Sequence, residues 1–256
     1  MGTRKLRVSL GSAGWAIFAL VGCSKVGGLL GSGSSIDITG LPELSSFESS
    51  PLTQFIVDAD GMTKISRTQP LMGSEGTAEA CQHNGAHVHF TDTGSDYTVN
   101  ILAPGKGVVS YVDPCKDNGD NDKVDLWLAI AQSDGDAVEL EYSIEPMAGH
   151  LCSNGGDESF FDSYILVEEG QEVEAGEVIA RFYRKASTLA GDDSAHIHYS
   201  LRLGDSVLCP DIFDTSLKST VFSLFNSLDL PGACRNFDFS ESTAFCVNPS
   251  AAESPF

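Results

Sequence analysis

The chain has 256 residues, with 15 Lys and Arg against 36 Asp and Glu, which gives a formal net charge of −21. This length suits one ordinary domain with appended segments. A chain this acidic has no basic stripe to neutralise phosphates, so its composition argues against nucleic acid as a partner. Its hydrophobic content of 41% supplies a packed core and argues against wholesale disorder.

The N-terminus has the pattern of an export signal. Three of the first seven residues are basic, and the run 8–22 that follows carries no charge. This run is shorter than the roughly 20 residues that span a bilayer. The stretch Leu20-Val21-Gly22-Cys23 resembles the lipobox of bacterial lipoproteins, whose signal is removed before a cysteine that carries lipid. The resemblance implies that 1–22 is a lipoprotein signal peptide and that lipid on Cys23 anchors an exported protein to the membrane. In a Gram-negative source the protein would lie at the outer membrane or face the periplasm. A plain signal peptide with an incidental cysteine is the alternative.

Composition divides the remaining chain into four parts. Residues 23–50 are rich in Gly and Ser and are expected to form a lipid-anchored flexible tether. Residues 51–76 have a mixed composition and are expected to form a poorly defined N-terminal extension. From 77 to 205, short apolar or alternating runs separated by turn residues predict an all-β sandwich or barrel. These runs are 97–102, 108–112, 124–131, 138–144, 164–167, 178–183 and 197–203.

The last part, 206–256, is expected to be a disulfide-rich C-terminal appendage with a short helical flank. A helix is predicted over 214–228, because apolar residues recur there at helical spacing. Apart from Cys23, six cysteines remain, an even number that fits disulfides in an oxidising compartment. We predict three disulfides, and the sequence leaves their pairing open. The six are Cys81, Cys115, Cys152, Cys209, Cys234 and Cys246.

Five of the six histidines gather in two short motifs. The first holds His83, His87 and His89, and Gly85 allows a bend that brings His83 and His87 to one point. The second, His196-Ile197-His198, lies in an alternating stretch that predicts a strand with both histidines on one face. Imidazole is a common metal ligand, so this concentration favours a metal site over two structural histidine pairs.

At these residues the sequence resembles the LytM and lysostaphin-type zinc endopeptidases, which cut peptidoglycan cross-links and are built on the duplicated hybrid motif. That family shows, in order, an H-x-G-x-D stretch, an A-x-x-x-G-x-V strand, a V-x-x-G-x-x-V-x-x-G-x-x-I hairpin and a final H-x-H. The corresponding stretches here are 83–87, 103–109, 167–179 and 196–198. The resemblance covers residues 76–204 and implies a LytM-like all-β fold that holds one zinc ion.

By this resemblance, His83 and His198 match two zinc ligands, and His196 matches a histidine that activates the attacking water. His87 stands where the family has an aspartate ligand, which implies a site of three histidines. Such a site is chemically sound for zinc, although imidazole also suits copper, nickel and iron. A further catalytic histidine of the family falls in a Y-x-H stretch, and its match here is Tyr142-Ser143-Ile144, whose Ile144 cannot move a proton.

The resemblance implies a zinc metalloendopeptidase that hydrolyses peptide bonds in peptidoglycan cross-links, with stem peptides as its partners. The lost histidine favours an alternative, a catalytically degenerate LytM-like adaptor that binds and regulates other cell-wall hydrolases. A third interpretation is a cupin-like barrel, because His87-Val88-His89 is a second H-x-H motif. The sequence lacks the glutamate and the later histidine that the cupin pattern places after such a motif.

Overall fold

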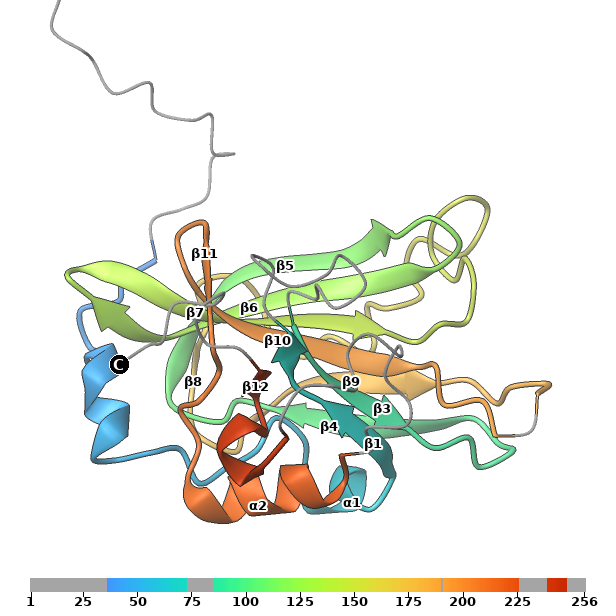
Figure 1. The fold of residues 1–256 in the computed structure, drawn as a ribbon. Helices are drawn as coiled ribbons and strands as arrows, with labels where there is room; N and C mark the ends of the chain where they lie inside the picture. The colour runs from blue at the N-terminus through green and yellow to red at the C-terminus, as the bar shows by residue number, and fades with distance from the viewer. Residues whose placement is uncertain (1–35, 73–84, 190, 226–238, 248–256) are drawn as a thin grey trace, which may run out of the picture. The chain divides into compact units, whose positions relative to one another are not determined.

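Antiparallel strands are the main regular elements of the computed structural model, which describes residues 36–72, 85–189, 191–225 and 239–247 (Figure 1). The main sheet has eight strands, seven in the order β1-β3-β10-β7-β6-β5-β8 and the eighth, β11, paired with β10. In chain order they are β1 (Ile65–Gln69), β3 (Ala86–Phe90), β5 (Gly107–Asp117), β6 (Asp122–Ser133), β7 (Asp136–Glu145), β8 (Glu172–Val173), β10 (His196–Leu203) and β11 (Ser206–Leu208). The expectation of a mostly β fold is confirmed.

Smaller elements surround the main sheet. β4 (Tyr97–Leu102) pairs antiparallel with β9 (Val178–Arg184), and β2 (Leu71–Met72) pairs parallel with β12 (Cys246–Val247). The helical elements are η1 (Leu44–Glu48), α1 (Ala59–Met62), α2 (Thr215–Ser223) and η5 (Glu241–Thr243). Among the described residues, no helix has the length and apolar character needed to cross a membrane.

Alternation along the central strands separates the two faces of the main sheet. In β7, Leu140, Tyr142 and Ile144 are buried in the core, while Glu141 and Ser143 point to the other face. β10 follows the same rule, since Ile197 lies opposite Ile144 in the core. All the predicted runs lie in strands except 164–167, which contributes only an isolated bridge between Ile165 and Ala180.

Residues 36–72, the described residues before β3, pack on the domain, whereas 23–50 was expected to be a flexible tether. The described residues all belong to one compact unit, Ser35–Phe256. Leu44 and Phe47 of η1 are buried in the core, and Ile56 is fully buried. β1 extends the main sheet beside β3. A few apolar side chains within a Gly- and Ser-rich stretch are enough to dock it, although they show no regular period.

The described part of the expected C-terminal appendage also belongs to the core. The rings of Phe213 and Phe245 lie 5.7 and 6.5 Å from the ring of Phe55. α2 starts where the sequence predicts a helix, because the Asp214 side chain accepts a hydrogen bond from the Leu217 amide and caps the first turn. The helix ends at Ser223, and residues 226–238 of the predicted appendage lie outside the described residues.

Two disulfides join cysteines of the described chain. Cys115 bonds to Cys152, and Cys209 bonds to Cys246. Cys81 and Cys234, the other two of the six cysteines for which three disulfides are predicted, lie outside the described residues. Each bond closes a loop with a sequence separation of 37, and a chain-entropy estimate for such a loop is about 3–4 kcal/mol. Disulfides are typical of oxidising compartments.

Candidate metal centre

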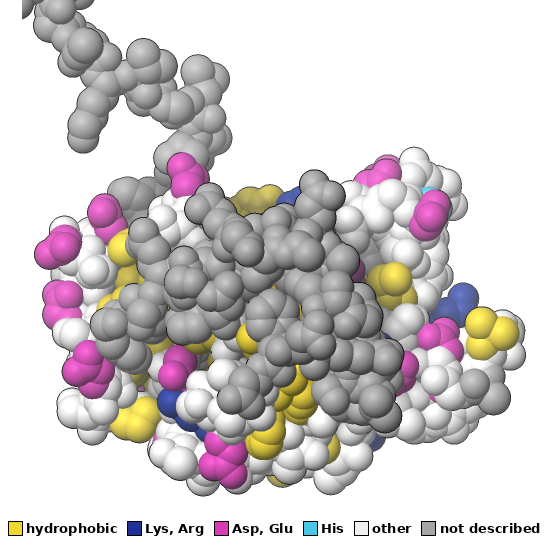
Figure 2. Space-filling view, in the orientation of Figure 1, with side chains coloured by type: hydrophobic (Ala, Val, Ile, Leu, Met, Phe, Trp, Pro, Cys, Tyr) yellow, Lys and Arg dark blue, Asp and Glu magenta, His cyan; other side chains and the backbone are white. Residues whose placement is uncertain are grey.

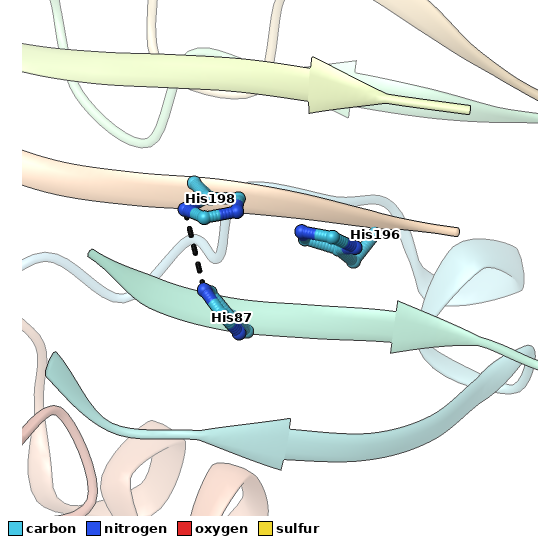
Figure 3. Close-up of side chains that lie close together, drawn as sticks. All are labelled: His87, His196 and His198. Carbon is cyan, nitrogen blue, oxygen red and sulfur yellow. Dashed lines mark hydrogen bonds between the residues drawn. The ribbon is translucent and has the colours of Figure 1, made fainter. Parts of the chain in front are cut away.

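The antiparallel pairing of β3 with β10 brings the two histidine motifs together. In this register His87 lies opposite His198, and His89 lies opposite His196. Side chains that are directly opposite on one face of an antiparallel pair lie close enough to interact. Figure 3 shows His87 projecting from β3 toward His198 of β10, with His196 beside them. Two motifs that are far apart in the sequence therefore form one cluster of imidazoles.

Ring nitrogens of three histidines converge. His87 Nε2 lies 3.2 Å from His198 Nδ1. The ring of His196 is centred 4.9 Å from that of His87 and 4.5 Å from that of His198. One nitrogen from each ring lies within 4.8 Å of the other two, so this group is able to hold a metal ion. Two nitrogens bound to a tetrahedral zinc, at about 2.0–2.1 Å each, would be about 3.3 Å apart, which matches the spacing of His87 and His198.

In His87 and His196, a hydrogen bond from one ring nitrogen fixes which nitrogen carries the proton. We call this hydrogen-bonded nitrogen the outer nitrogen of the ring. Gln69 Oε1 lies 2.9 Å from His87 Nδ1, so Nδ1 donates and the lone pair of His87 is on Nε2. His196 Nδ1 donates to the backbone carbonyl of Ser194 in the same way. A histidine that binds a metal ion needs one unprotonated ring nitrogen for the ion. Its other ring nitrogen almost always donates a hydrogen bond, as the outer nitrogens do here.

The resulting environment of His196 fits a metal ion. Its Nε2 is buried and has no hydrogen-bond partner among the described residues. A buried acceptor without a partner costs free energy, so such groups need an explanation. Burial lowers the pKa of His196, while its hydrogen bond to the Ser194 carbonyl acts in the opposite direction. The neutral imidazole that burial favours is the form that binds metals.

His89 lies beside this group without being one of its three members. Its ring is centred 4.8 Å from that of His196 and 5.4 Å from that of His87. Its Nδ1 lies 3.0 Å from the backbone carbonyl oxygen of Asp193, in the loop that leads into β10. The described part of the site therefore contains four clustered imidazoles, of which His87, His196 and His198 converge.

From β7, the side chains that face the histidines are Ser143 and Glu145. Ser143 lies opposite His198, and Glu145 lies opposite His196. Ile144 is 2% exposed and points into the core, because successive side chains of a strand alternate between faces. Glu145 Oε1 is 3.5 Å from His198 Nε2, and Glu145 Oε2 is 3.8 Å from His196 Nε2. The group that approaches the cluster from this strand is thus a carboxylate, one residue beyond the position that the family pattern indicates.

A small cavity opens beside His198. Its volume is about 170 Å³, and its walls include Lys123, Glu141, Glu145 and Arg202. A water molecule occupies about 30 Å³ of liquid, so the cavity has room for several waters or one short polar side chain. Its lining carries both signs of charge, because two basic and two acidic side chains contribute to it.

The structure brings together three of the predicted site residues, His87, His196 and His198. His83, the other predicted ligand, and Cys23, the predicted lipidation site, lie outside the described residues. The sequence interpretation did not single out Glu145, although Glu141, Ser143 and Glu145 alternate with apolar residues and so share one face of a predicted strand. Comparison with known proteins finds no family profile that matches the chain and no curated protein that is significantly similar to it.

Proposed function

We propose that this protein is a metal-dependent peptide hydrolase of the LytM type. The observation that carries the proposal is the convergence of one ring nitrogen each from His87, His196 and His198, with His87 Nε2 3.2 Å from His198 Nδ1. Neutral imidazoles in this number suit one zinc ion. The family resemblance adds His83 as a ligand and gives His196 the role of proton acceptor, so His83 and His196 are the two candidates for the third ligand position.

The chemistry of the site would depend on a bound ion and on the residues around it. A zinc ion held by His87, His198 and a third histidine would lower the pKa of water toward 7 and polarise a carbonyl oxygen, which is the chemistry of peptide hydrolysis. Gln69 and the Ser194 carbonyl orient two of the rings through their outer nitrogens. The cavity beside His198 has room for one short polar group of a substrate next to the proposed ligands.

We propose stem peptides of peptidoglycan as the substrate class, on the strength of the four matched stretches. Both signs of charge line the cavity, which suits peptides that carry amino and carboxyl groups together. Acidic side chains are spread over the visible described surface (Figure 2), and this field disfavours anionic polymers. We further propose that lipid on Cys23 anchors the protein to a membrane after export.

A second candidate is the adaptor that binds and regulates other cell-wall hydrolases. The observation that favours it is the position of Ile144, where the family has a catalytic histidine. This side chain lies in the core and cannot exchange a proton at the site. Loss of an acid or base group typically costs about 10²–10⁴ in rate. An adaptor needs no such group, so it tolerates this change without penalty.

Metal analysis of the full chain, purified with its disulfides formed, tests the proposal. We expect one zinc per chain in the wild type and none in His198→Ala. His89→Ala is the matched control, because it removes a neighbouring imidazole that is not one of the three convergent residues. If the control keeps the metal, cleavage of cross-linked peptidoglycan is the next assay. A wild-type protein that takes up no metal when zinc is supplied would contradict the hydrolase proposal and favour the adaptor.

A further inference from the structure

We propose that Arg202 forms a binding site for a carboxylate group of a peptide, on the face of β10 that also carries His198. The inference deepens the proposed function, because it assigns a chemical class of ligand, a peptide with a free carboxylate, to the cavity beside the histidines. Its relevance to hydrolysis rests on the proposed function, but carboxylate binding itself needs no metal.

Strand alternation places Arg202 on the sheet face of the candidate metal centre. His198, Ser200 and Arg202 are alternate residues of β10, so their side chains lie on one face. Ser143 of β7 lies opposite His198, and Glu141 lies opposite Ser200. All five residues line the cavity of about 170 Å³. The two serines have short side chains among longer ones, which explains why the sheet face is hollowed here.

Two contacts hold the guanidinium of Arg202 in place. Its Nε donates a hydrogen bond of 2.5 Å to Glu141 Oε2. Its Cζ lies over the ring of Trp127, 5.7 Å from the ring centre, which is the geometry of a cation–π contact. The ring of Tyr111 packs against the same indole, with the two ring centres 5.1 Å apart. A side chain anchored in this way loses less freedom when it binds a ligand than an unanchored arginine does.

These contacts use only part of the hydrogen-bonding capacity of Arg202. A guanidinium has five N–H groups, and Glu141 takes the one on Nε. The N–H groups of Nη1 and Nη2 have no hydrogen-bond acceptor among the described residues. The side chain is 26% exposed, so a ligand can reach it. Two parallel N–H groups of a guanidinium match the two oxygens of a carboxylate, which is why arginine is preferred for this contact.

Two further charged side chains of the cavity, Glu141 and Lys123, are already paired. Glu141 accepts the hydrogen bond from Arg202. Lys123 Nζ lies 2.8 Å from Ser143 Oγ and 3.1 Å from Asp125 Oδ1. The unused capacity at the Arg202 end of the cavity therefore consists of donors, which need an acceptor as their partner. Salt screens the acidic residues that lie more than about 8–10 Å away, so direct contact with the guanidinium decides what binds.

Two short peptides test the inference: acetyl-alanyl-alanine, which ends in a carboxylate, and its carboxamide, which has nearly the same shape and no charge. Their binding to the full chain, kept metal-free with a chelator, is measured at physiological salt through ¹⁵N–¹H signals. The indole of Trp127 is the reporter, because it lies against Arg202. Trp15 is the other tryptophan of the chain, and Trp15→Phe identifies its signal. We expect the Kd of the carboxylate peptide to be about 10–100-fold lower than that of the carboxamide, which is the range for hydrogen bonds to a charged group.

Arg202→Gln removes the proposed contact, and Arg181→Gln is the matched control. Arg181 is an exposed residue of β9, so its loss changes the net charge equally without touching the cavity. We expect Arg202→Gln to bind the two peptides with equal Kd and the control to keep the wild-type preference. An Arg202→Gln variant that keeps the preference would overturn the inference.

The wild type alone also decides the inference, even if Arg202→Gln fails to fold. A wild type that binds neither peptide, or binds both equally, would overturn it. A preference for the carboxylate that leaves the Trp127 signal unmoved would overturn it too, because the carboxylate would then bind elsewhere.

This titration and the metal analysis can fail independently. A wild type that binds no zinc but prefers the carboxylate peptide, with movement of the Trp127 signal, would contradict the proposed hydrolase and keep the Arg202 site. A wild type that binds zinc and shows no such preference would contradict only the Arg202 site.

Discussion

His87 and His198 face each other across β3 and β10, with His87 Nε2 3.2 Å from His198 Nδ1. Without an ion between them, one of the two nitrogens donates to the other. If both nitrogens bound one tetrahedral zinc ion, they would lie about 3.3 Å apart, which is close to this distance. The stability of the protein should therefore depend on zinc through this pair.

Zinc is expected to raise the melting temperature of the wild type. A ligand that binds only the folded state stabilises it by about 2.7 kcal/mol at a concentration of 100 Kd. His87→Ala removes one of the convergent nitrogens, so we expect its melting temperature to be insensitive to zinc. Differential scanning calorimetry with and without zinc measures both effects. His87→Asp, which restores the residue type of the LytM family, is expected to keep the zinc-dependent shift. If His87→Ala keeps the full shift, His87 is not a ligand.

Two histidines, His83 and His196, are candidates for the third ligand position of the metal site. The family resemblance makes His83 a ligand, and we therefore expect His83→Ala to lose zinc in a metal analysis. His196→Ala is then expected to keep most of the metal and to lose peptidase activity, because this ring would serve as the proton acceptor. The reverse pattern, in which His83→Ala retains zinc and His196→Ala loses it, would assign the third position to His196, one ring nitrogen of which converges with those of His87 and His198.

The common face of His196 and His198 is predictable from the sequence because strand alternation is a local property. The same alternation places Glu145 on that face, whereas the Y-x-H pattern indicates Ile144, whose side chain lies in the core. Alternation along a single strand is therefore a better guide to the face of a residue than a match to a short motif.

The pairing of segments is much harder to predict, because it depends on contacts between distant parts of the chain. β2 and β12 pair although they are far apart in the sequence, and the Cys209–Cys246 disulfide lies next to that pairing. The docking of η1 through Leu44 and Phe47 has no periodic signal either. Isolated apolar residues in a Gly- and Ser-rich stretch look the same whether the stretch packs or stays extended.

Asp122 is expected to make folding sensitive to acid. Burial by itself raises the pKa of this carboxyl, but hydrogen bonds from the Ser153 side chain, the Ser153 and Cys152 amides and the His150 ring outweigh burial and lower the pKa to about 2. The ordinary value is 3.8, so the folded state binds this proton less tightly than the unfolded state. The stabilisation is therefore fully present above the unfolded pKa and is lost as the pH falls from about 4 to about 2.

The size of this effect follows from the shift in pKa, which corresponds to about 2 kcal/mol for a buried group. Urea unfolding at a series of pH values between about 5 and 2 measures it. Asp122→Asn is the comparison, because the amide keeps the shape of the side chain and does not titrate. We expect the free energy of unfolding of the wild type to fall by about 2 kcal/mol more than that of the variant over this range. Parallel pH profiles would show that Asp122 does not contribute in this way.

Cys23→Ser is expected to release the protein from membranes. The lipobox resemblance makes this cysteine the attachment point of the lipid, and a serine offers no thiol for the attachment. Several acyl chains on one residue anchor a protein stably, whereas a single chain gives only marginal binding, so the release should be nearly complete. Fractionation of cells that express the wild type or the variant measures it, with Cys115→Ser as the control because that thiol belongs to a disulfide of the folded unit. A Cys23→Ser variant that stays in the membrane fraction would mean that another segment anchors the protein.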